Sequence, residues 1–231
     1  MILGAEALYA VLQPAPRQTE FDPSGVFGDA GDPPLRIAVL GDSSVTAPGV
    51  GGPEEIWVNI VGRRAAEKRH VTLRSHAVSG ARTDDLLRDQ LEPAITFDPD
   101  VFLVSVGAND VIHGVGMRLF ERRLDELVST LTETGALVIL SGVGDIGTIP
   151  RLKPPLRNLM TQRSARFDRV HHKVAARYGA HVVPHRKDDP TIWYTDRGLW
   201  SADKFHVSAA GHRRWADSTW RTVEPLLEQH G

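Results

Sequence analysis

The sequence predicts a single α/β domain built on an open parallel sheet with helices on both faces. Two observations predict it: short runs that are nearly all apolar alternate with longer segments of helical periodicity, and the alternation continues from Leu35 to the C-terminal region. A length of 231 residues suits one domain, or one domain with an arm. We therefore expect residues 35–231 to form one three-layer α/β/α domain and residues 1–34 to form an N-terminal segment.

Five apolar runs are expected to be strands, because strands covered by helices on both faces are apolar along their whole length. They are Leu35 to Leu40, Val71 to Val78, Val101 to Val106, Ala136 to Leu140 and His181 to Val183. Parallel strands joined by right-handed helical crossovers give, in the simplest case, the flavodoxin-like order 2-1-3-4-5.

Five segments with apolar residues at three- and four-residue spacing are expected to be helices. They are Glu54 to Lys68, Thr83 to Leu91, Gly116 to Glu133, Leu156 to Tyr178 and Ser208 to Glu228. They fall between the apolar runs and after the last of them, as a βαβ arrangement requires.

The first residues favour no single interpretation. Met1 to Leu12 is mostly apolar with only Glu6 charged, and it lacks the basic region and the small-residue cleavage site of a signal peptide. It is either a short docking helix or the remainder of a longer anchor or signal, and an anchor would associate the protein with a membrane surface. The compartment stays open between the cytoplasm and an exported or membrane-anchored state. Five prolines between residues 14 and 34 then predict an extended arm.

Charge and composition exclude several classes of protein. Lys and Arg number 27 and Asp and Glu 29, so the net charge of −2 supplies no field that would attract nucleic acid. Without cysteine there is no disulfide scaffold, thiolate metal site or cysteine nucleophile. No apolar run approaches the ~20 residues that cross a bilayer.

Polar residues that carry chemistry follow the expected strands. Gly41-Asp42-Ser43-Ser44 follows the first strand, Ser79-Gly80 the second, and Gly107-Ala108-Asn109-Asp110 the third. Asp203-Lys204-Phe205-His206 precedes the last helix. Because ligands bind at the carboxyl ends of the strands in open α/β sheets, we expect these segments to meet at one edge.

In this order the four segments resemble the four blocks of the SGNH (GDSL-type) hydrolase family, over about Leu35 to Trp220. The resemblance implies that Ser43 is the nucleophile and His206 the general base, oriented by Asp203. It also implies that Gly80 and Asn109 are oxyanion-hole donors beside the backbone N–H of Ser43. The third residue after Gly41 is Ser44 where the signature has leucine, and Val207 replaces a proline common after the histidine. Ser44 is also a rival nucleophile.

The residue types suit this chemistry independently of the family. A serine hydroxyl is a weak nucleophile unless a base takes its proton during attack, and histidine titrates in the range that this task needs. A carboxylate on the other ring nitrogen holds the required tautomer. A glycine lets a backbone N–H approach the oxyanion without a Cβ in the way, and an asparagine amide supplies a further donor.

We therefore expect a serine esterase that hydrolyses acyl or acetyl esters of lipids, sugars or small alcohols through an acyl-enzyme on Ser43. It would need no cofactor and no metal. An acyltransferase with the same acyl-enzyme and an alcohol acceptor stays open, as does a binding module that has kept the fold and lost turnover. The oligomeric state and the acyl-chain length stay open too.

Two further patterns resemble ligand sites, but we expect neither of them to bind a ligand. The GxGxxG sequence from Gly142 to Gly147 is followed by prolines rather than a helix, so we do not expect a dinucleotide site. The histidines at 171, 172, 181 and 185 lack carboxylates at ligand spacing and are expected at the surface.

Two long connections are expected to border the site, residues 144–155 and 184–201. Their apolar side chains are candidates to receive an acyl chain, or to cap the core. These candidates are Ile146, Ile149, Leu152, Trp193, Leu199 and Trp200.

Overall fold

The computed structural model describes residues 18–187 and 191–229 of the chain. The N-terminal segment expected as a docking helix or anchor, Met1 to Leu12, lies outside the described residues. Within the described part, no helix has the length and apolarity needed to span a bilayer.

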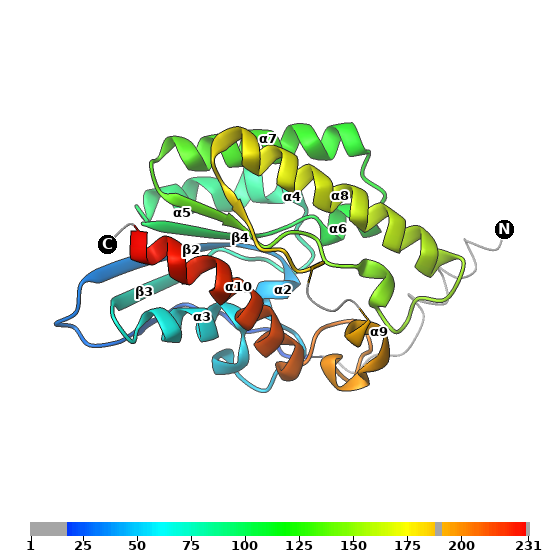
Figure 1. Cartoon of the computed structure of the whole chain (residues 1–231), viewed down its shortest axis with the longest axis horizontal. Coiled ribbons are helices and arrows are strands. Elements are labelled where there is room, and N and C mark those ends of the chain that lie inside the picture. The colour runs from blue at the N-terminus through cyan, green and yellow to red at the C-terminus, as the bar shows by residue number, and fades with distance from the viewer. Residues whose placement is uncertain (1–17, 188–190, 230–231) are drawn as a thin grey trace.

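A six-stranded sheet forms the centre of the molecule, and Figure 1 shows it between two layers of helices. Its order is β1-β3-β2-β4-β5-β6. The pairs β3–β2, β2–β4, β4–β5 and β5–β6 are parallel, and β1 runs antiparallel to β3 at the edge. The strands are β1 (Gly25–Phe27), β2 (Pro34–Gly41), β3 (His70–Ser75), β4 (Val101–Ser105), β5 (Leu137–Leu140) and β6 (His181–Val182).

The five expected strands are all present, and β3, β2, β4, β5 and β6 follow one another in the expected order 2-1-3-4-5. The edge strand β1 was not expected. This strand has only three residues, too few to show a period in the sequence. It is held by pairing with β3 and by its aromatic residue: Phe27 contacts the helix position Gly62, and the Arg63 guanidinium lies 5.0 Å from the centre of its ring. A sheet edge can thus gain a strand that the sequence pattern does not predict.

The helices divide between the two faces of the sheet (Figure 1). The face with α3 (Trp57–Ala65) and α10 (Ala209–Gln229) is opposite the face with α4 (Thr83–Asp85), α5 (Leu91–Thr96), α7 (Met117–Glu133) and α8 (Leu156–Tyr178). Three short helices lie near the carboxyl ends of the strands: α2 (Ser43–Thr46), α6 (Ala108–Ile112) and α9 (Ile192–Thr195). Single turns complete the fold: η1 (Pro53–Glu55), the π-helical η2 (Leu86–Gln90), η3 (Ile146–Thr148) and η4 (Arg197–Leu199).

Alternate residues of the strands enter two separate cores. Along β2, Ala38 and Leu40 pack with the α7 and α8 layer, whereas Ile37 and Val39 pack with α3 and α10. All four are buried, because successive side chains of a strand point to opposite faces and both faces are covered here. This double coverage explains why the strands read as continuous apolar runs.

The strand register brings the carboxyl ends to one edge. Gly41 of β2 is level with Ser105 of β4, and Leu140 of β5 is level with both Val104 and Val182 on its two sides. The segments that follow β2, β4, β5 and β6 therefore lie side by side, and they form the floor of the site.

Candidate active site

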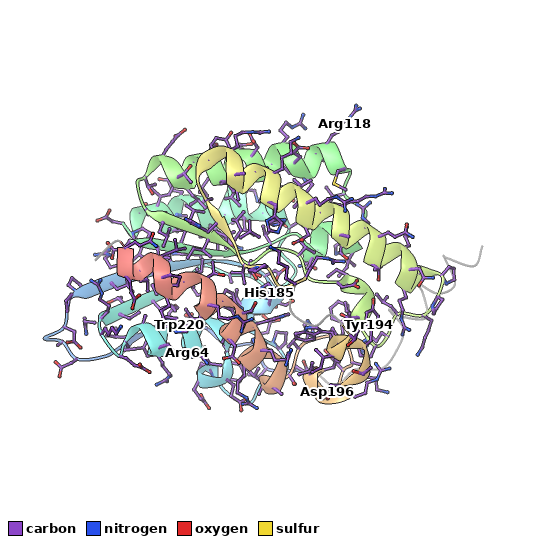
Figure 2. The ribbon with its side chains drawn as sticks, viewed as in Figure 1. Arg64, Arg118, His185, Tyr194, Asp196 and Trp220 are labelled. Carbon is purple, nitrogen blue, oxygen red and sulfur yellow. The ribbon has the colours of Figure 1, made fainter. Side chains whose placement is uncertain are left out.

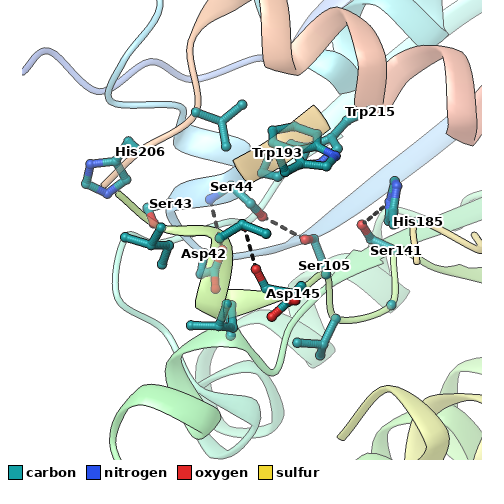
Figure 3. A pocket seen from close by; sticks show the side chains of 18 of the residues that line it. Asp42, Ser43, Ser44, Ser105, Ser141, Asp145, His185, Trp193, His206 and Trp215 are labelled. Atoms are coloured by element: carbon teal, nitrogen blue, oxygen red, sulfur yellow. Dashed lines mark hydrogen bonds between the residues drawn. The ribbon is translucent and has the colours of Figure 1, made fainter. Parts of the chain in front are cut away.

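A cavity of about 440 Å³ opens at the carboxyl edge of the sheet. Its lining comes from the segments after β2, β4, β5 and β6, and from the 144–149, 193–207 and α10 regions. Both long connections that were expected to border the site contribute to it. Figure 3 shows the cavity with Ser43 and His206 at one end and His185 at the other.

Ser43 is the first residue of α2. Asp42 caps this helix: its backbone is extended, and its Oδ1 accepts a hydrogen bond of 2.9 Å from the backbone N–H of Ser44. The N–H groups of a first helical turn have no partner within the helix, and in the described part of the chain the N–H of Ser43 has no acceptor. The strand-turn-helix geometry thus presents a hydroxyl and a free backbone donor at the same point.

Asp203 and His206 are joined directly. Nδ1 of His206 lies 2.6 Å from Oδ2 of Asp203, while the other carboxylate oxygen accepts the backbone N–H groups of Phe205 and His206 and the Ser201 hydroxyl. Burial alone would raise the pKa of Asp203, but these hydrogen bonds outweigh it and hold the pKa well below its usual range. A carboxylate that stays ionised in this position keeps the proton of the imidazole on Nδ1.

The resemblance identified Ser43 as the nucleophile and His206 as the base. Both residues line the cavity, at the same end of it (Figure 3). Nε2 of His206 makes no hydrogen bond within the described residues, and none joins it to Ser43. Pairs of this kind often tighten only when substrate binds. The structure therefore places the two groups in one cavity, with the nitrogen that would take the proton unoccupied.

Of the two expected oxyanion-hole residues, Asn109 lines the cavity, whereas Gly80 is not among the lining residues and follows Ser79, whose hydroxyl is joined to Thr46 of α2. Gly80 has a positive φ of 80°, which favours glycine, and its N–H has no acceptor among the described residues. Asn109 lines the cavity, but its amide donates both hydrogens, to Oδ2 of Asp42 (2.9 Å) and to the carbonyl of Ala81 (3.1 Å). Asn109 must release one of these to donate to an oxyanion, whereas the two backbone N–H groups are already free.

Side-chain hydrogen bonds hold the turns of the site to each other. The hydroxyl oxygens of Thr46 and Ser79 are 2.8 Å apart, which joins α2 to the segment after β3. The backbone N–H and the hydroxyl of Thr83 both donate to Oδ2 of Asp110, at 3.0 Å. Burial raises the pKa of Asp110, although these two hydrogen bonds act to lower it. These bonds join the turn after β3 to α2, and α4 to α6.

The rest of the cavity carries further polar groups, of which Ser105 and Ser141 were not selected by sequence reasoning. The hydroxyl oxygens of Ser44 and Ser105 are 2.7 Å apart, and Oγ of Ser141 lies 3.1 Å from Nε2 of His185. Ser105 ends β4 and Ser141 follows β5 directly, so the strand-end rule that selected Ser43 also applies to these two positions. Figure 2 shows His185 between the sheet and α10.

Four of the six apolar candidates line the cavity: Ile146, Ile149, Trp193 and Trp200. The other two do not. Leu152 packs in a small cluster with Ile149 and Leu156, and Leu199 is buried. Trp215 of α10 is an aromatic lining residue that was not among the candidates.

The expectation that the histidines lie at the surface is wrong for His171, and His181 and His185 are only partly exposed. His171 is only 1% exposed and packs on Phe120, with 5.4 Å between the ring centres, because it lies on the sheet-facing side of α8. His185 is half-buried and lines the cavity. No group of three or more potential metal ligands is present in the described ranges.

The doubly wound fold and the four converging blocks define the SGNH class of hydrolase folds. The GDSL-like lipase/acylhydrolase family matches residues 39–214, and the chain belongs to this family.

A relative in sequence is a GDSL-like esterase of Mycobacterium tuberculosis, 27% identical over 200 residues. The match covers 84% of this chain and 63% of that protein, so the chain spans less than two thirds of its relative's length. Among solved structures, TesA superposes with a TM-score of 0.69 at 24% identity, covering 83% of this chain and 99% of TesA. Axe2, an acetylxylan esterase from Geobacillus stearothermophilus, gives 0.67 at 20% identity over 82% of this chain and 94% of Axe2.

Proposed function

We propose that this protein hydrolyses carboxylic esters through an acyl-enzyme on Ser43. One observation carries the proposal: the Asp203–His206 pair, with 2.6 Å between Oδ2 and Nδ1, shares a cavity with a serine at a helix start whose N–H is free. The family match supports it, as does the description of the sequence relative as an esterase.

The first half of the reaction forms the acyl-enzyme. Oγ of Ser43 attacks the carbonyl carbon of the ester while Nε2 of His206 takes the hydroxyl proton. The carbonyl oxygen becomes an oxyanion, and the N–H groups of Ser43 and Gly80 donate to it. The Asn109 amide donates to it as well, after releasing one of its two present acceptors. The bond to the leaving alcohol then breaks, and His206 returns the proton to the alcohol oxygen.

The second half repeats these steps with water. His206 takes a proton from a water molecule as its oxygen attacks the acyl carbon, and the proton returns to Oγ of Ser43 when the acid leaves. Asp203 stabilises the imidazolium that forms in each half. If an alcohol occupied the position of water, the same acyl-enzyme would transfer its acyl group instead.

Hydrolysis of p-nitrophenyl acetate tests the proposal. Ser43→Ala should lower kcat by a factor on the order of 10⁶, because the substitution removes the hydroxyl on which the proposed acyl-enzyme forms. Ser44→Ala should cost less than about tenfold, since it removes only a hydrogen bond beside the nucleophile. Ser129→Ala, on the exposed side of α7, is the matched control.

Three results would contradict the proposal. If Ser43→Ala kept wild-type turnover, Ser43 would not be the nucleophile. Failure of the wild type on every activated ester would favour a binding module. Acyl transfer that exceeds release of free acid when glycerol is added would favour an acyltransferase.

A further inference from the structure

The cavity continues well beyond Ser43. Its floor crosses the strand ends in the order β2, β4, β5, β6, with Ser44, Ser105, Ser141 and His185 as successive lining residues. Neighbouring strands lie ~4.8 Å apart, so the three steps from β2 to β6 span about 14 Å. This is far more room than an acetyl group needs.

The proton transfer from His206 to the leaving alcohol decides which part of an ester occupies the cavity between Ser44 and His185. His206 delivers a proton to the leaving alcohol, so the alcohol must lie beside His206. Figure 3 shows His206 at one end of the cavity and His185 at the opposite end, with Ser43 close to His206. The acyl part of the substrate therefore extends away from His206, across Ser105 toward Ser141.

One wall of this acyl region is aromatic. The ring centres of Trp193 and Trp215 lie 6.0 Å apart, and Trp200 packs edge-on against Trp193 at 5.8 Å. These rings suit the methylene groups of an acyl chain. Ile146 and Val143 extend the apolar lining.

The far end of the acyl region is polar. Ser141 Oγ and His185 Nε2 form a hydrogen bond of 3.1 Å, and either tautomer of His185 leaves the serine hydroxyl one hydrogen-bonding direction. If the histidine accepts, the serine oxygen can still accept from a ligand. If the histidine donates, the serine O–H can still donate to one. A plain alkyl chain would remove water from this pair and return no hydrogen bond, which is unfavourable.

The charged residues of the cavity do not favour an ion as the ligand. Asp145 and Arg186 both line the cavity, so the lining carries both signs. The Asp145 carboxylate already accepts the Tyr194 hydroxyl at 2.7 Å and the Gly147 N–H at 2.9 Å. A neutral group that both donates and accepts hydrogen bonds fits such surroundings best.

We propose that Ser141 and His185 form a subsite for a hydroxyl group on the acyl part of the substrate, so that hydroxyacyl esters are preferred over plain fatty acyl esters. The inference rests on the proposed function, because the direction of the acyl group follows from the role of His206. Ser141 and His185 act here on specificity and do not take part in bond making.

Matched ethyl esters test the subsite. Plain alkanoates from hexanoate to dodecanoate are compared with their ω-hydroxy counterparts, with the released acid followed by titration. The wild type should favour the hydroxy ester by about tenfold in kcat/KM at the chain length that reaches Ser141, the effect of roughly one hydrogen bond.

Ser141→Ala and His185→Phe should each bring this ratio close to one, chiefly by lowering kcat/KM of the hydroxy ester. Ser129→Ala makes the same substitution as Ser141→Ala on the surface of α7 and should keep the wild-type ratio.

Hydrolysis of p-nitrophenyl acetate separates the two proposals, since an acetyl group is too short to reach the subsite. An enzyme that cleaves the acetate but shows a ratio of one or less at every chain length would overturn the subsite alone. A hydroxy-ester preference that survives in both variants would also overturn it. An enzyme inactive on the acetate would overturn the proposed function itself.

Discussion

The two ends of the cavity each hold a serine and a histidine, yet they differ in the backbone around the serine. Ser141 lies in an extended segment, and its N–H donates to the carbonyl of Val104 at 2.7 Å. Ser43 begins a helix, and its N–H has no acceptor in the described part of the chain. A hydroxyl near an imidazole is therefore common to both ends, whereas a donor for an oxyanion belongs to the Ser43 end.

The imidazoles differ as well. His206 is bound through Nδ1 to a carboxylate that is 6% exposed and keeps its negative charge, and its Nε2 is unoccupied. Nε2 of His185 is already engaged with Ser141. The comparison teaches that the oriented, unoccupied base and the free backbone donors distinguish a nucleophile from a binding hydroxyl.

The strongest way to break this comparison is to remove the carboxylate behind His206. Asp203→Asn should lower kcat on p-nitrophenyl acetate by about 10⁴, because the amide no longer holds the tautomer or stabilises the imidazolium. Asp196→Asn, in the same part of the chain but outside the cavity, is the matched control and should stay within about twofold. If Asp203→Asn kept wild-type turnover, the carboxylate behind His206 would not be what distinguishes the Ser43 end from the Ser141 end.

A smaller loss should follow from removing the asparagine amide. Asn109→Ala is expected to lower kcat by 10² to 10³, the typical contribution of one oxyanion-hole donor. The loss should lie in kcat rather than KM, since the donor acts on the transition state. Asn158→Ala on the exposed surface of α8 is the control. An unchanged kcat would mean that Asn109 only bridges Asp42 and Ala81, as it does in this structure.

A separate effect, on stability rather than on turnover, concerns a third histidine, His212 of α10, which lines the cavity beside Trp215. Burial lowers the pKa of His212 to about 3, from an ordinary value of 6.5. Between these values the unfolded chain binds a proton that the folded chain does not, so stability falls as the pH drops through this window. At about 1.4 kcal/mol per pKa unit, the shift from 6.5 to about 3 corresponds to a loss on the order of 4 kcal/mol when the pH falls from 6.5 to 3.

Urea unfolding of His212→Gln between about pH 6.5 and 3 checks this, because the substitution removes the titrating group. The variant should lose less stability on acidification than the wild type. The same replacement at the exposed His113 should leave the pH dependence as it is in the wild type. Equal acid sensitivity in His212→Gln and the wild type would contradict the account.

Much of the fold could be predicted because the apolar period is strong. The helix from Leu156 to Tyr178 has the expected bounds, ending where Gly179 takes a positive φ of 71°. The order of the five expected strands was likewise correct. The strand β1 and the short helices α2, α6 and α9 were missed, because three to five residues are too few to show a period.

The site was predictable to the extent that its chemistry lies in local blocks. Asp203 and His206 are three residues apart and bond to each other, so the sequence alone pairs them. Ser141 and His185 are 44 residues apart and meet only because β5 and β6 are neighbours in the sheet. Their pairing follows from tertiary structure, which a single sequence does not display.

The most direct test of the central claim is to locate the covalent adduct that a fluorophosphonate forms on the active protein. Peptide mapping by mass spectrometry should find the adduct on Ser43 and on no other serine, in step with the loss of esterase activity. An adduct on Ser44 or Ser141, or complete inactivation with Ser43 unmodified, would contradict the claim that the helix start beside His206 holds the nucleophile.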